Sequence, residues 1–249
     1  MTPIRNAQSV GRNAPHLVLF DVDGTLLVTG GATSRCIRRA CERVLGERFR
    51  WTKVTPGRLD PQLFADLAAG CGIERASEKL DEYKAAYLSE LQAELACRRD
   101  DVKVLPGVHE LLKELQVRDD VVIGLLTGNF RRAVELKLEA AGLERGQFPI
   151  GAFAEDGNER CDLVTAALRQ FEQLTGAALP ADRVILVGDT PQDIACARRA
   201  GCRVLSVSTG HYSLDDLKRE KPDAAVATLE DVEPLRAMLE GNSATDEHR

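Results

Sequence analysis

The stretch Leu17-Val18-Leu19-Phe20-Asp21-Val22-Asp23-Gly24-Thr25-Leu26 decides how this chain folds. Its four leading apolar residues show no polar alternation, which is typical of a strand buried on both faces of a parallel sheet. Ligands bind such sheets beyond the carboxyl ends of the strands, where Asp21 and Asp23 would emerge. Alternate side chains of an extended segment point the same way, so the two carboxylates can converge, and Gly24 allows a sharp turn after them.

The rest of the chain divides into a helical block and an alternating block. Residues 30–103 contain no convincing strand, and helical spacing predicts helices over 33–45, 61–69 and 77–96. Apolar strands then follow at 121–126, 150–153, 184–187, 203–207 and 224–226, and the predicted helices between them include 131–141 and 193–200. We therefore expect an α/β fold: a parallel Rossmann-like sheet with helices on both faces and an all-helical cap inserted after the first strand. The expected divisions are a core domain of residues 15–29 and 104–240, a cap domain of residues 30–103, and flexible termini at 1–14 and 241–249.

Bulk properties exclude several classes of partner. The 249 residues carry a net charge of −6, which disfavours nonspecific binding to nucleic acids or anionic membranes. No apolar stretch approaches the ~20 residues that span a membrane, and the first fifteen residues lack the apolar core of a secretion signal. The seven cysteines form no Cys-x-x-Cys pair, which argues against zinc and favours reduced thiols in the cytoplasm. A monomer and a homodimer are both compatible with the sequence.

Three later loops should share the sheet edge with Asp21 and Asp23. They are Thr127-Gly128-Asn129, the segment 155–160, and Gly188-Asp189-Thr190-Pro191-Gln192-Asp193, each following a predicted strand. Asp189 and Asp193 would thus approach the first two aspartates, and like charges at ~4 Å repel by about 4 kcal/mol at an effective dielectric of 20. Carboxylates without histidine or cysteine suit a hard divalent ion, and we expect Mg²⁺ held by Asp21, Asp23, Asp189 and Asp193.

Donors at the same edge would suit a phosphate group. Thr127 offers a hydroxyl, and Gly128 and Asn129 offer backbone N–H groups near a helix start. Arg160 offers a fixed positive charge. A carboxylate nucleophile surrounded by a metal, a hydroxyl and a cation indicates phosphoryl transfer through an aspartyl-phosphate. Gly24 and Thr25, next to the two aspartates, complete the predicted phosphate-binding set.

These motifs, in this order, resemble the haloacid dehalogenase superfamily. The helical insert after the first motif is similar to its phosphoglycolate-phosphatase-like branch, over roughly residues 16 to 235. The resemblance implies that Asp21 attacks phosphorus and that Asp23 protonates the leaving oxygen and then activates water. It also implies that Mg²⁺ lies between Asp21, the Asp23 carbonyl and Asp189, with Asp193 supporting it directly or through water, and that Thr127 holds the phosphoryl group of a small phosphorylated metabolite.

One position departs from the family pattern. The third motif of the family normally carries lysine, and the candidate here is Arg160, which keeps the charge and can bind phosphate in a forked mode. Lys137 is an alternative donor, but its position in the predicted helix after Thr127 favours a surface or packing role. Structural alternatives also stand: Asp193 as a helix cap, and Arg160 as a solvated residue at a helix start.

The helical insert should cover the acidic edge and contact the substrate. Its best candidate loop is Thr55-Pro56-Gly57-Arg58-Leu59-Asp60, in which Arg58 would touch the leaving group and Asp60 would cap the next helix. A surface role is an equal alternative for Arg58. Other functions remain open at this point: a sugar phosphomutase of the same branch, a haloacid dehalogenase, disfavoured by Asp23 and the Asp189/Asp193 pair, and a catalytically silent binding module that keeps the fold.

Overall fold

Strand β1 (His16–Phe20) lies in the middle of a six-stranded parallel sheet. We describe residues 16–52 and 54–241 of a computed structural model, so the predicted flexible ends at 1–14 and 241–249 lie, apart from Gly241, outside the described residues. The strand order is β5-β4-β1-β6-β7-β8. The other strands are β4 (Val121–Leu126), β5 (Ile150–Ala152), β6 (Val184–Gly188), β7 (Arg203–Val207) and β8 (Ala224–Val226).

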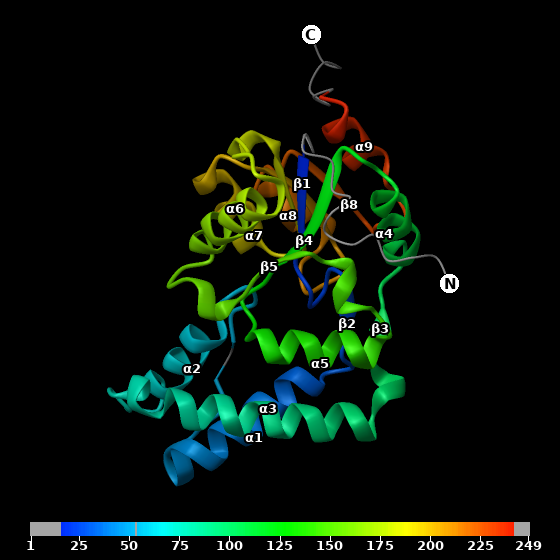
Figure 1. Cartoon of the computed structure of the whole chain (residues 1–249). Coiled ribbons are helices and arrows are strands. Elements are labelled where there is room, and N and C mark those ends of the chain that lie inside the picture. The colour runs from blue at the N-terminus through cyan, green and yellow to red at the C-terminus, as the bar shows by residue number, and fades with distance from the viewer. Residues whose placement is uncertain (1–15, 53, 242–249) are drawn as a thin grey trace.

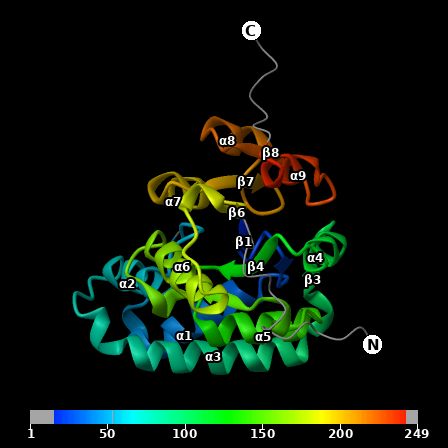
Figure 2. The ribbon, with the colours of Figure 1, turned by 45° about the horizontal axis from the view of Figure 1, so that its top comes forward.

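The two faces of the sheet bury separate apolar layers. Along β1, Leu17 and Leu19 join one cluster, whereas Val18 and Phe20 join the other, because successive side chains of a strand point to opposite faces. Helices α6 (Asp162–Thr175) and α7 (Pro191–Ala200) cover one face, and α4 (Val108–Gln116) and α9 (Glu233–Leu239) cover the other (Figure 2). The predicted α/β sheet with helices on both faces is thereby confirmed.

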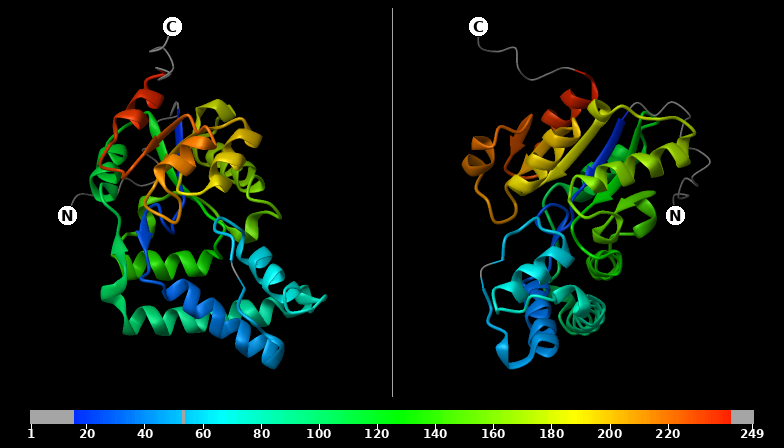
Figure 3. Two further views of the ribbon diagram at one scale, coloured as in Figure 1. Left: turned by 180° about the vertical axis from the view of Figure 1, so that it is seen from behind. Right: turned by 90° about the vertical axis from the view of Figure 1, so that its left-hand side faces the viewer.

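A helical block lies beyond the carboxyl ends of the strands. It contains α1 (Ala32–Leu45), α2 (Asp60–Ala69) and α3 (Leu80–Cys97), and Figures 1 and 3 show these helices grouped below the sheet. Helix α5 (Arg131–Ala141) lies between the sheet and α3 (Figure 1). The block is entered and left through β2 (Leu27–Val28) and β3 (Lys103–Val104), which pair antiparallel. The sequence did not predict this pair, because two-residue strands are too short to show a hydrophobic period.

Other differences from the predicted elements are small. Helix α7 begins at Pro191 rather than Asp193, since Pro is favoured at the first position of a helix. Helix α8 (Leu214–Arg219) and α9 were missed; both are short and give weak periodic signals. No helix among the described residues is long and apolar enough to cross a membrane.

Aromatic rings join the helical block to the sheet domain. Phe64 of α2 stacks on Tyr83 of α3 with ring centroids 4.2 Å apart, and Tyr83 stacks on Tyr87 at 6.0 Å. Tyr87 in turn contacts Phe130, which directly precedes α5, at 6.5 Å. This continuous row of buried rings fixes the helical block against the loop that follows β4.

Candidate active site

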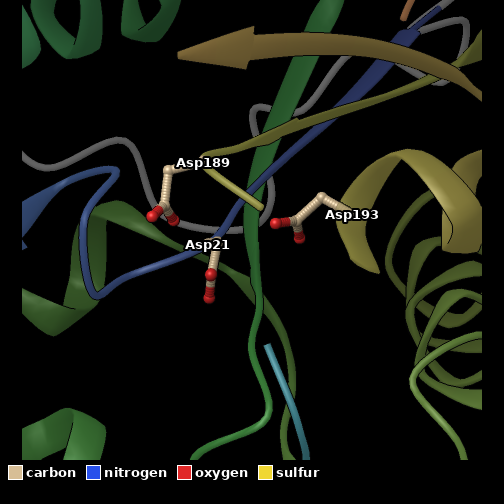
Figure 4. Close-up of side chains that lie close together, drawn as sticks. All are labelled: Asp21, Asp189 and Asp193. Atoms are coloured by element: carbon tan, nitrogen blue, oxygen red, sulfur yellow. The ribbon is translucent and has the colours of Figure 1, made fainter. Parts of the chain in front are cut away.

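Three buried carboxylates meet at the carboxyl edge of the sheet. Asp21 directly follows β1, Asp189 directly follows β6, and Asp193 lies in the first turn of α7. One carboxylate oxygen of each lies within 4.8 Å of the others, and Figure 4 shows the three around the end of β1. Strands β1 and β6 are neighbours in register, which brings together residues 168 positions apart in the sequence (Asp21 and Asp189). The predicted convergence therefore holds for these three aspartates.

Two glycines leave the space that the Asp189 carboxylate fills. A Cβ at Gly24, whose φ is 81°, would lie 2.4 Å from Asp189 Oδ2, and a Cβ at Gly210 would lie 1.7 Å from it. The hydroxyl of Thr25 donates to Asp189 Oδ1 at 3.3 Å, and the Thr25 side chain is fully buried. Thr25 was predicted to bind phosphate; in the structure its hydroxyl instead holds a carboxylate of the cluster.

Arg160 faces this cluster with a buried guanidinium. Its Nη2 lies 3.1 Å from Asp21 Oδ2 and donates to Asp193 Oδ1 at 2.5 Å. Its Nε also donates to Asp193 Oδ1, at 3.1 Å, and its Nη1 donates to the Gly57 carbonyl oxygen, at 3.3 Å. Burial lowers the pKa of Arg160, but the carboxylates of Asp193 and Asp21 outweigh burial and raise that pKa overall. The alternative of a solvated residue at a helix start is wrong, because the side chain is 8% exposed.

Both oxygens of Asp193 already have partners. Oδ1 accepts from Arg160, and Oδ2 accepts from the backbone N–H of Thr190 at 3.1 Å and from its hydroxyl at 2.6 Å. The Thr190 hydroxyl accepts from the Asp193 N–H at 3.4 Å, which completes a capping box at the start of α7. Asp193 thus caps its helix and also orients Arg160, an arrangement that favours an indirect role at a metal.

The charges in this site do not balance by themselves. Burial raises the pKa of Asp21, and the Arg160 guanidinium opposes this increase. Burial also raises the pKa of Asp189, and the neighbouring Asp21 and Asp193 carboxylates raise it further. One guanidinium facing three carboxylates leaves excess negative charge in a buried place, which a divalent cation would neutralise. The all-oxygen donor set fits a hard ion such as Mg²⁺.

Asp23 points to a different partner. Its Oδ2 accepts a 2.5 Å hydrogen bond from Nζ of Lys137, which donates a second one to Asn129 Oδ1 at 2.6 Å. The Lys137 side chain is fully buried, whereas that of Asp23 is 35% exposed. Of the predicted surface or packing role of Lys137, the surface alternative is therefore wrong, whereas burial agrees with the packing alternative. The sequence did contain a signal: Lys137 follows Phe130, Ala133 and Val134 at helical spacing, on the apolar face of α5.

The loop after β4 brings Thr127 to the cluster, and the Asn129 N–H donates to the Thr127 hydroxyl at 3.5 Å. The Thr127 hydroxyl hydrogen-bonds the Asp21 carboxylate, which partly opposes the increase that burial causes in the pKa of Asp21. The Thr127 N–H donates to the Ala152 carbonyl oxygen at 3.1 Å, and the Asn129 carbonyl oxygen accepts from Ala154 at 2.9 Å. A Cβ at Gly128 would lie 2.3 Å from the Arg58 carbonyl oxygen, so the loop of the helical block lies directly against it.

Asp60 ties the helical block to the same loop. Its N–H donates to the Gly128 carbonyl oxygen at 2.7 Å, and its Oδ2 accepts from the Phe130 N–H at 2.7 Å. The prediction that Asp60 caps its own helix is wrong: α2 has no side-chain cap, and the carboxylate bonds a segment 70 residues away. Burial raises the pKa of Asp60 to about 7, and the Lys137 charge opposes that increase. Sequence reasoning missed this contact because nothing local distinguishes it from a cap.

Arg58 lies beside the site but has its own partner. Its Nε and Nη2 donate to the two carboxylate oxygens of Asp66, each at 3.0 Å, and its side chain is 38% exposed. With Arg160 it lines a cleft of about 260 Å³ between the helical block and α7. Contact between Arg58 and a leaving group stays a prediction, and it would require the guanidinium to exchange Asp66 for substrate.

Comparisons with known proteins agree with this geometry. Residues 18–207 match the family described as haloacid dehalogenase-like hydrolase. The phosphoglycolate phosphatase of Pseudomonas fluorescens is 26% identical over 227 residues, which cover 88% of this chain and 79% of that protein. The phosphoglycolate phosphatase of Rhodospirillum rubrum is 28% identical over 200 residues, covering 79% of this chain and 81% of that protein.

A solved structure shows the same fold at lower identity. The β-phosphoglucomutase of Clostridium difficile superposes with a TM-score of 0.68 at 16% identity, over 91% of this chain and 97% of that one. The family match spans the strand-end aspartates, the Thr127 loop and the Gly188–Asp193 loop that build the carboxylate site. The chain therefore belongs to the haloacid dehalogenase-like hydrolase family.

Proposed function

We propose that the protein is a magnesium-dependent phosphatase that hydrolyses a small phosphomonoester through an aspartyl-phosphate on Asp21. The observation that carries the proposal is the difference in surroundings between Asp21 and Asp23, which are two residues apart in the sequence. Asp21 is buried beside Arg160 and the Thr127 hydroxyl, in the carboxylate cluster. Asp23 is held outside that cluster and remains partly exposed to solvent, which suits a group that exchanges protons.

The residues suggest a two-step reaction. The Asp21 carboxylate attacks phosphorus and the bond to the leaving oxygen breaks, while Asp23, in its protonated form, gives that oxygen a proton and becomes a carboxylate. Asp23 then takes a proton from a water molecule that attacks the phosphorus, which releases phosphate and restores Asp21. We assign the holding of the phosphoryl oxygens to Thr127, the N–H groups of Gly128 and Asn129, and Arg160.

The metal would be held by side chains that already converge. Asp21 and Asp189 would bind Mg²⁺ with the Asp23 carbonyl oxygen, and Asp193 would support it while orienting Arg160. The ion supplies positive charge that neutralises the carboxylates and the phosphoryl group.

The helical block is proposed to act as a cap. Its loop at Gly57 accepts a hydrogen bond from Arg160, and its Asp60 bonds the Thr127–Phe130 loop, so it lies over the reacting groups. Such a cover excludes water and contacts the leaving group. We assign residues 30–103 to this cap domain and residues 15–29 and 104–240 to the core domain. The names of the relatives support a small phosphorylated metabolite as substrate; we place the enzyme in the cytoplasm, as a monomer or homodimer.

The test is hydrolysis of p-nitrophenyl phosphate with and without Mg²⁺. Wild-type protein should release phosphate only with the metal, and Asp21→Asn should abolish the release without unfolding the protein. Beryllofluoride should form an adduct on Asp21. An inactive wild type, an active Asp21→Asn variant, or a folded protein without the adduct would refute the proposal, and the last result would favour a silent binding module. Conversion of a sugar phosphate into its isomer without release of phosphate would instead identify a phosphomutase, and chelator-resistant halide release a dehalogenase.

A further inference from the structure

Lys137 is the buried charge that the proposed mechanism leaves unused. Its side chain is fully buried, and its Nζ hydrogen-bonds only Asp23 Oδ2 and Asn129 Oδ1 among the described residues. We propose that Lys137 is a positioning residue that holds the Asp23 carboxylate in the orientation needed for proton transfer. This inference rests on the proposed function, because it assigns Lys137 a role through Asp23.

Burial makes a purely packing role costly. An ammonium group removed from water loses several kcal/mol of hydration, and replacement of a buried ion pair by apolar residues is often neutral or stabilising. Lys137 is surrounded on α5 by residues that pack well without charge: Ala133, Val134, Leu136 and Leu138. An apolar side chain would therefore satisfy packing, and the charge needs another reason.

The contacts of Lys137 supply that reason. Asn129 belongs to the loop that carries Thr127, and its carbonyl oxygen accepts from the Ala154 N–H at 2.9 Å. Lys137 lies eight residues after Asn129, about two turns along the chain, and it belongs to α5. The helix therefore holds its Nζ against that loop. It thereby connects the carboxylate of Asp23, on the loop after β1, to the proposed phosphate-binding loop after β4.

A second acid lies near the same charge. The Asp60 carboxylate interacts electrostatically with Lys137, although its hydrogen bond goes to the Phe130 N–H. Lys137 is thus placed between one carboxylate of the core and one of the cap. The direct 2.5 Å bond goes to Asp23, which is the only one of the two that reaches solvent: the Asp23 side chain is 35% exposed, whereas Asp60 is 3% exposed.

The expected consequence is specific to the steps that Asp23 performs. A partly exposed aspartate has several rotamers, and misplacing a catalytic group by about 1 Å costs about 10²-fold in rate. Without Lys137, phosphoryl transfer from an alkyl phosphate should slow, because an alkoxide needs a proton to leave. Transfer from p-nitrophenyl phosphate should be largely spared, because p-nitrophenolate leaves unprotonated, but hydrolysis of the aspartyl-phosphate should still slow.

The experiment compares Lys137→Met with Asp23→Asn and the double variant. We expect Lys137→Met to lower kcat for glycerol 2-phosphate by about 10- to 100-fold. With p-nitrophenyl phosphate it should give a stoichiometric burst of p-nitrophenolate before a slow steady state. In the Asp23→Asn background the same substitution should change the residual rate by less than about twofold, since two residues that act as a unit are not additive. Lys113→Met, an exposed lysine on α4, is the matched control and should match wild type.

The outcomes separate the two proposals. A wild type that releases no phosphate from any ester refutes the proposed function. The positioning role alone is refuted if the wild type is active and a folded Lys137→Met variant has unchanged kcat and no burst. It is also refuted if Lys137→Met lowers the residual rate of Asp23→Asn as much as it lowers the rate of wild type. If Lys137→Met does not fold, Lys137→Gln replaces it, because the uncharged amide of glutamine can still donate a hydrogen bond to Asp23. The Lys137→Gln variant should then be more active than Asp23→Asn. Equal activities of folded Lys137→Gln and Asp23→Asn would overturn the inference.

Discussion

Replacement of Arg160 by methionine removes the guanidinium that faces the three carboxylates. The change deletes the contacts with Asp193 at 2.5 and 3.1 Å, the contact with Asp21 at 3.1 Å and the bond to the Gly57 carbonyl oxygen at 3.3 Å. Methionine has a similar length and no charge, so the perturbation is mainly electrostatic. Both carboxylates would then be buried without their cation.

The size of the effect follows from burial. Breaking a buried ion pair by removing one partner costs about 3–5 kcal/mol of folding stability, and removing one donor that stabilises charge in a transition state costs about 10²- to 10³-fold in kcat. We therefore expect kcat/KM for Arg160→Met to fall by at least about 10²-fold. Arg160→Lys keeps the charge, but one ammonium cannot reproduce the forked contacts with Asp193 and Asp21 and the bond to Gly57. Because a hydrogen bond to a charged group contributes about 1.5–3 kcal/mol, we expect an intermediate loss of about 10- to 100-fold.

The assay is p-nitrophenyl phosphate hydrolysis at saturating Mg²⁺, with circular dichroism to establish folding. Arg199→Met is the matched control, because Arg199 lines the same cleft but is 68% exposed and, among the described residues, forms its ion pair with the exposed Glu159. Such a surface pair contributes about 0–1 kcal/mol, so the control should stay close to wild type. A folded Arg160→Met variant that keeps kcat/KM within about threefold of wild type would refute the assignment of Arg160 as the counter-charge of the site.

Two further substitutions test the metal site and the cap contact. Gly210→Ala would place a Cβ 1.7 Å from Asp189 Oδ2 and displace that carboxylate. We therefore expect the Mg²⁺ concentration for half-maximal activity to rise at least about tenfold. The control Gly146→Ala, whose Cβ would have no atom within 4 Å, should leave that concentration unchanged. Unaltered metal dependence in Gly210→Ala would count against Asp189 as a ligand. The folded-state pKa of Asp60 is raised from 3.8 to about 7, so its contribution to stability is fully present below pH 3.8 and is lost as the pH rises to about 7. Urea unfolding from about pH 4 to about pH 8 should therefore show Asp60→Asn gaining stability relative to wild type up to about pH 7 and no further; a difference that does not change with pH would contradict the buried, protonated Asp60.

Much of the fold was predictable because local patterns of apolar and turn-forming residues specify it. The strands Val121–Leu126, Arg203–Val207 and Ala224–Val226 have the predicted bounds, since uninterrupted apolar runs bounded by polar turns mark buried parallel strands. Helix Arg131–Ala141 also has its predicted bounds, with Gly142 ending it in the left-handed conformation that glycine favours. Short elements were not predicted: the paired β2 and β3 have two residues each, and their pairing depends on a partner 77 positions away (Leu27 and Val104).

The sequence by itself determined that Asp21 and Asp189 would meet, because both directly follow apolar strands and parallel strands end at one edge of a sheet. It also placed a cation at Arg160 near that edge. Only the tertiary structure decided which cation meets which carboxylate: Arg160 contacts Asp21 and Asp193, whereas Lys137 contacts Asp23. It alone revealed that Asp60 of the helical block bonds Phe130 rather than its own helix. The physical reason is that periodicity fixes which residues form an element and which face is buried, whereas the partner of a side chain depends on how separate elements pack across tens of residues of sequence.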